Sequence, residues 1–134
     1  MLRSAVAAAC LSLLAAPVLA AETAASNSSY VDITPMALPI VQGGRVVNYV
    51  FVSVRLWARS GTDVTGLRAQ EPYFRDAVLR SAYRTSYAAR NDLTRVDEAV
   101  FSRAVAAEAT RIAGRPVFQR VEITSQQPMR RHAR

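Results

Sequence analysis

Apolar and polar residues alternate with a period of two along residues 46–57, which is the pattern of a strand with one buried face. One face carries mainly aliphatic side chains, and we expect it to lie in the core: Val46, Asn48, Val50, Val52, Val54 and Leu56. The opposite face carries Val47, Tyr49, Phe51, Ser53, Arg55 and Trp57. Twelve extended residues span about 40 Å, which is longer than a typical strand. We therefore expect the far end of this strand to project or bend.

A second β-prone stretch precedes it, at residues 30–41. Pro35 and Pro39 lack backbone N–H donors, so this stretch is expected at the edge of a sheet or in broken pieces. Gly43 and Gly44 lie between the two stretches, and glycine adopts the positive φ of a tight hairpin turn at little steric cost. The two stretches should therefore pair as a hairpin.

The hydrophobic period changes to 3.6 after Pro72, a residue suited to the first turn of a helix. The stripe expected to pack on the sheet is Phe74, Ala77, Val78, Ser81, Ala82 and Thr85. Glu71 with Arg75, and Asp76 with Arg80, are four residues apart with the acid first, an arrangement that favours ion pairs on a helix surface. The segment therefore predicts an amphipathic helix.

A second helix is predicted with Thr94 as its N-cap and with Asp97 and Glu98 in its first turn. Its apolar side would comprise Phe101, Ala104, Val105 and Ile112. Gly114 and Pro116 should end it.

The closing segment, residues 117–124, alternates again, with Val117, Val121 and Ile123 facing one way. The predicted order is β-β-α-α-β. We therefore expect one α+β domain in which two helices pack on a small antiparallel or mixed sheet.

The first twenty residues have the organisation of a secretory signal peptide: Arg3, an apolar run over residues 5–16, and a small-residue exit. Cleavage is expected after Ala20 or Ala21. The alternative is an uncleaved anchor, although residues 5–21 fall short of the roughly 20 apolar residues that span a bilayer comfortably. Residues 21–29 are predicted to be a flexible linker and residues 128–134 a basic tail.

Few side chains in the chain can carry covalent or metal chemistry. All 17 basic residues are arginine, and the chain has one cysteine, Cys10, and one histidine, His132, which lies in the tail. These counts exclude a disulfide framework, a Cys/His zinc site built from this chain alone and a lysine Schiff base. The acids Asp92, Asp97 and Glu98 are interpreted as favouring a helix N-terminus rather than catalysis. We expect no enzymatic activity, no metal and no cofactor.

The net charge of +7 is concentrated in part on the first predicted helix and the segment after it. The candidate interaction surface comprises Arg75, Asp76, Arg80, Tyr83, Arg84 and Tyr87. Two interpretations remain open: a solvated face partly neutralised by its acids, or a surface that meets anionic lipid or an acidic partner. Tyr83 and Tyr87 could form an exposed stacking pair or pack at the edge of the core. Export of the chain argues against nucleic acid.

Four segments, in this order and spacing, resemble the periplasmic part of the FliL family of flagellar basal-body-associated proteins. They are a long apolar strand at residues 45–58; the run Phe74-Arg75-Asp76-Ala77-Val78-Leu79; Thr85 or Ser86 followed by Leu93; and a closing strand with glutamine at residues 117–127. The resemblance covers residues 30–127. The chain departs from the family in having a signal peptide in place of a membrane anchor, Asp97 or Glu98 in place of a glycine, and alanine at many aliphatic positions.

The resemblance implies a stomatin-like α+β fold and a noncatalytic role beside the flagellar stator. Expected partners are stator or basal-body proteins and further copies of the chain, because family members assemble in rings. The location implied is the periplasm, with contact to the inner membrane if the N-terminal segment is not cleaved. The alternative function is a periplasmic adaptor or envelope-binding module unrelated to motility, which would use the Arg-rich face.

Overall fold

Two long strands joined by a two-residue turn form the framework of the molecule. Strand β1 (Tyr30–Gln42) pairs antiparallel with β2 (Arg45–Ala58). Gly43 and Gly44 form the turn with φ values of 57° and 74°. This is the positive-φ conformation that the glycine pair predicted. Strand β5 (Phe118–Pro128) pairs antiparallel with the other side of β2, so the sheet order is β1-β2-β5.

This computed structural model describes residues 29–129. The predicted signal peptide with Ala20 and Ala21, nearly all of the predicted linker, and His132 with the end of the basic tail lie outside the described residues.

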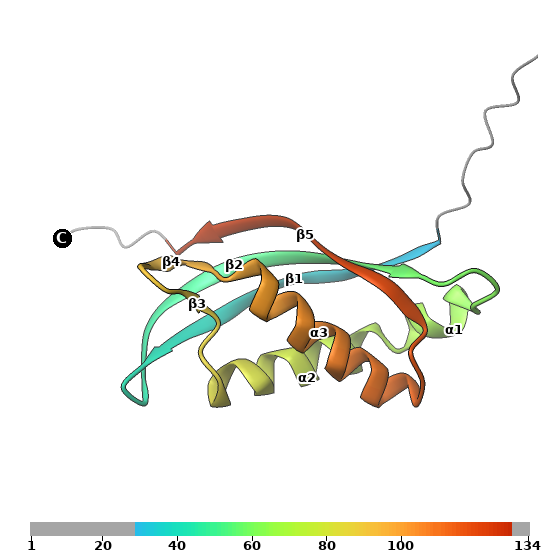
Figure 1. Cartoon of the computed structure of the whole chain (residues 1–134), viewed down its shortest axis with the longest axis horizontal. Helices are drawn as coiled ribbons and strands as arrows, with labels where there is room; N and C mark the ends of the chain where they lie inside the picture. Colours follow the sequence, from blue (N-terminus) through green and yellow to red (C-terminus); the bar gives the residue numbers. More distant parts are fainter. Residues whose placement is uncertain (1–28, 130–134) are drawn as a thin grey trace, which may run out of the picture.

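Helices α1 (Val64–Ala69), α2 (Glu71–Arg84) and α3 (Glu98–Ala113) follow the hairpin. Helices α2 and α3 lie on one face of the sheet, α2 against β1 and α3 against β5 (Figure 1). A small second sheet, β3 (Ala88–Ala89) with β4 (Asp92–Val96), lies in the connection between these two helices. The predicted α+β domain is confirmed, and of the two predicted sheet types the antiparallel one is found. Elements α1, β3 and β4 are added to the predicted order.

The core lies between the sheet and α2 and α3. Helix α2 buries the predicted stripe of Phe74, Ala77, Val78, Ser81 and Ala82. Thr85 is the exposed C-cap of α2 and does not belong to the stripe, because the chain is already extended there. The sheet contributes a layer of aliphatic side chains that includes Leu38, Ile40, Val50, Val52, Val54 and Leu56.

The residues of β2 next to the hairpin turn do not belong to the buried face of this strand. Val46 is 41% exposed and Asn48 is half-buried, so their assignment to the core is wrong. The register shifts between Ile40 and Val41, and the hairpin bends at its turn end (Figure 1). The end of β2 next to the turn therefore leaves the core, whereas the sequence analysis expected this of the far end of the strand.

Strand β1 is continuous despite its two prolines and lies at the border of the sheet, as predicted. The register shifts between Ile33 and Met36, around Pro35. The Thr34 N–H donates to Glu71 Oε1 at 2.8 Å. The predicted ion pair between Glu71 and Arg75 is not formed, because the Glu71 carboxylate turns to this strand instead.

The start of α3 differs from the prediction. Asp97 is the N-cap, and its carboxylate accepts a hydrogen bond from the Val100 N–H at 3.0 Å. Thr94 lies in β4, where its N–H and hydroxyl both donate to Asp92. Gly114 ends the helix in the left-handed region at φ 74°, as predicted.

Replacing Asp97 by alanine removes this cap and is expected to lower the free energy of unfolding by about 0.5–2 kcal/mol. Urea unfolding followed by circular dichroism measures the loss. Asp97→Ser is the matched control, since a serine hydroxyl can accept the same hydrogen bond. An equal loss in both variants would contradict the assignment of Asp97 as the cap.

Candidate interaction groove between helices α2 and α3

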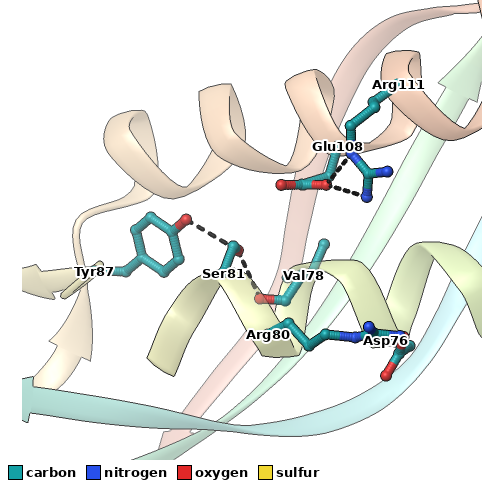
Figure 2. Close-up of polar contacts among 7 residues, drawn as sticks. All are labelled: Asp76, Val78, Arg80, Ser81, Tyr87, Glu108 and Arg111. Carbon is teal, nitrogen blue, oxygen red and sulfur yellow. Dashed lines mark hydrogen bonds and ion pairs between the residues drawn. The ribbon is translucent and has the colours of Figure 1, made fainter. Parts of the chain in front are cut away.

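A buried polar contact joins α2 to the segment that leads to β3. The Tyr87 hydroxyl donates to Ser81 Oγ at 3.0 Å, and the Ser81 hydroxyl donates to the Val78 carbonyl oxygen at 2.7 Å (Figure 2). The Tyr87 ring packs edge-on against Phe101 of α3, with centroids 5.4 Å apart. Tyr87 is only 4% exposed. Its inclusion in the interaction surface is therefore wrong, because its ring and hydroxyl are both used within the core.

A groove of about 310 Å³ lies between α2 and α3. Two ion pairs mark its sides: Arg80 Nε donates to Asp76 Oδ2 at 2.8 Å on α2, and Arg111 Nη2 donates to Glu108 Oε2 at 2.7 Å on α3 (Figure 2). The residues that line the groove are Tyr73, Asp76, Ala77, Arg80, Arg84, Glu108, Arg111 and Ile112. The interaction groove therefore combines an apolar base with charged sides.

The charges of the interaction groove are not balanced. Three arginines face two carboxylates, which leaves one formal positive charge. Arg84 makes no ion pair with another described residue. The Arg80–Asp76 pair is exposed on both sides, and ion pairs of that kind contribute little to stability. A guanidinium can also bind a partner carboxylate through two parallel hydrogen bonds. The groove is thus suited to an acidic side chain carried on a partly apolar segment.

Half of the predicted surface residues meet at this groove. Asp76, Arg80 and Arg84 line it, whereas Arg75 is half-buried outside it. Tyr83 is 57% exposed, and a hydrogen bond with Tyr49 raises the pKa of its hydroxyl. Of the two alternatives for these tyrosines, Tyr87 packs in the core against Phe101, and the stacking of Tyr83 on Tyr87 does not occur.

Three further groove residues were not part of the predicted interaction surface: Tyr73, Glu108 and Arg111. Glu108 and Arg111 are three residues apart on α3, which is a recognisable surface pair. Only the packing of α2 beside α3 brings this pair to the same groove as Arg80.

The acids near the start of α3 each have a local partner. Hydrogen bonds from the Thr94 side chain and N–H lower the pKa of the Asp92 carboxyl. Glu98 Oε1 accepts from the Gln126 amide at 2.7 Å. Among residues 29–129, no three His, Cys, Asp or Glu side chains are grouped so as to hold a metal ion.

No family model and no curated protein matches the chain. Over the described part of the chain, no helix has the length and apolar character needed to cross a membrane.

The pKa of the Asp76 carboxyl reports on the Asp76–Arg80 ion pair of α2. Hydrogen bonding from Arg80 lowers the pKa of the Asp76 carboxyl. We expect Asp76 to titrate below an ordinary aspartate in a carboxyl-detected NMR titration, and Arg80→Gln to move its pKa upward. Because the folded pKa is lowered, the stabilisation is present above the ordinary aspartate pKa and is lost as the pH falls through the lowered value. An unchanged Asp76 titration in Arg80→Gln would show that the pair does not form in solution.

Proposed function

We propose that this chain is a noncatalytic periplasmic accessory protein of the bacterial flagellar motor that supports stator function through protein contacts. The observation that carries the proposal concerns the segment Phe74-Arg75-Asp76-Ala77-Val78-Leu79, which resembles the FliL family. This segment lies in the middle of α2, and its Asp76 and Ala77 line the interaction groove. The segment behind the resemblance thus supplies one exposed side chain, Asp76, to the groove.

The other segments of the resemblance support the same proposal. The long apolar strand corresponds to β2, Arg45–Ala58, and the closing strand with glutamine corresponds to β5, Phe118–Pro128. Both belong to the three-stranded sheet that carries α2 and α3. The order of segments along the chain therefore agrees with the α+β fold that the resemblance implies.

The chemistry of the interaction groove favours a protein partner. Its guanidinium groups come from two helices, and its base carries Ala77 and Ile112. An acidic helix or loop of a stator or basal-body protein would satisfy both the charge and the apolar base.

A clean deletion of the gene tests the proposal. We expect a smaller swimming ring in soft agar, with flagella still assembled, and restoration of the ring by a plasmid copy. Swimming equal to that of the parent strain would overturn the motor assignment and favour the periplasmic adaptor that uses the Arg-rich face.

Salt dependence separates the adaptor's possible partners. Binding to vesicles with anionic headgroups should weaken steeply as ionic strength rises, because exposed charges are screened within about 10 Å at 0.1 M salt. Binding that persists in high salt would indicate contact through packing instead.

A further inference from the structure

The two borders of the main sheet differ in how open they are to a further strand. An edge strand presents unpaired backbone groups that can pair with another chain. The β1 border is obstructed, because Pro35 and Pro39 have no N–H and the Thr34 N–H is bonded to Glu71. In β5 the only proline is Pro128, its last residue. The β5 border is therefore the one suited to strand addition.

The first half of β5 is the open part of this border. At the other end, the Val96 N–H of β4 donates to the Gln126 side chain at 3.1 Å, so β4 lies beside that end. A second groove, of about 200 Å³, flanks the first half of β5. It is lined by Ser102, Arg103 and Ala106 of α3 and by Phe118, Gln119, Arg120 and Val121. Side chains of an added strand would find space there.

The charge pattern of β5 is complementary to a second copy of the same strand. Arg120 and Glu122 are the only charged residues in this strand, and Val121 separates them. In an antiparallel pair of two β5 strands centred on Val121, Arg120 of each copy lies opposite Glu122 of the other. No other antiparallel register of two β5 strands gives both opposite-charge pairs.

The local structure already holds both side chains in place, and Arg120 Nη2 lies 3.5 Å from Glu122 Oε2 within the same strand, an ion pair that a second copy would extend across the dimer. Trp57 Nε1 donates to Glu122 Oε2 at 2.6 Å, and the Arg120 guanidinium lies 4.7 Å from the centre of the Trp57 ring. The register between β5 and β2 is regular from Arg120 to Ile123, between two register shifts. The centre of the added pairing thus falls on a stretch of the edge that pairs regularly with β2.

We propose that two copies of this chain associate through their β5 borders, with the two-fold axis at Val121, so that the two sheets form one continuous antiparallel sheet. Such an interface is isologous and closes as a dimer. The proposal does not depend on the motor function.

Reversing the charge of Arg120 or Glu122 tests this dimer directly. The molecular mass of each purified protein is measured by light scattering. We expect twice the chain mass for the wild type, and the single-chain mass for Arg120→Glu and for Glu122→Arg, because each places like charges opposite one another. Mixing the two variants should restore the double mass, since every facing pair is then of opposite sign. The double variant should also form a dimer. Thermal melting confirms that each variant is folded.

A wild type that stays at the single-chain mass at its highest soluble concentration would overturn the proposal. So would two folded single variants that do not associate on mixing.

Cross-linking locates the axis independently. In a Cys10→Ser background, Val121→Cys should form a disulfide-linked dimer on oxidation, because antiparallel partners lie within about 4.5–5.5 Å between Cα atoms. Ser125→Cys is the control, as its two copies would lie about 26 Å apart in this register. Equal cross-linking at both positions, or none at position 121, would contradict the two-fold axis.

Discussion

Replacing Phe101 by alanine is expected to lower the free energy of unfolding by about 3–5 kcal/mol. The ring is fully buried and packs edge-on against Tyr87, whose hydroxyl bonds to Ser81. The substitution removes apolar contact and leaves a cavity where α3 meets the end of α2. Because domains of this size are typically stable by only about 5–15 kcal/mol, the loss would bring the protein close to unfolding.

The matched control is Phe51→Ala, which removes the same side chain from the sheet. Phe51 is 45% exposed, and its neighbours Val50 and Val52 point into the core instead. We expect a loss below about 1 kcal/mol there. Chemical unfolding of both variants measures the difference, and equal losses would show that the core is not where the structure places it.

Neutralising the interaction groove with Arg80→Gln and Arg84→Gln is expected to disrupt partner binding while leaving folding largely unchanged. Hydrogen bonds to charged groups contribute about 1.5–3 kcal/mol each, and about 1.4 kcal/mol corresponds to a tenfold change in affinity. The loss of even one such bond should weaken the affinity for the stator protein about tenfold or more, and so lower the amount of it that co-purifies with a tagged copy.

A variant with the same change in charge separates this effect from overall electrostatics. Arg59 and Arg90 are exposed and do not line the groove, so Arg59→Gln with Arg90→Gln should retain normal recovery of the partner. Melting temperatures of both double variants should stay near that of the wild type. Equal loss of binding in the two variants would mean that net charge, and not the groove, attracts the partner.

The long periodic segments were predictable because a single physical preference governs each. The 3.6-residue stripe of α2 and the two-residue alternation in the middle of β2 describe the buried faces that the structure shows. Gly43 and Gly44 supplied a turn that few other residues can form. At these places local preference and tertiary packing favour the same conformation.

The prediction was wrong where tertiary contacts decide. Strand β3 has only two alanines and carries no periodic signal, and its presence places Thr94 in a strand rather than at the helix start. Val46 has the right period but lies where the hairpin bends away from the core. The sequence left Tyr87 open between an exposed surface and the edge of the core, and only the fold supplies the buried partner of its hydroxyl, Ser81.

The interaction groove was only half predictable for the same reason. Asp76, Arg80 and Arg84 share one helix, so their spacing placed them together. Glu108 and Arg111 join them only because α3 packs beside α2, and no spacing in the chain carries that information.

The location of the protein in living cells tests the central claim most directly. A copy fused to a fluorescent protein that folds in the periplasm should form foci that coincide with labelled flagellar basal bodies. Uniform fluorescence around the envelope of swimming cells, with the fusion restoring wild-type behaviour, would contradict a role at the motor.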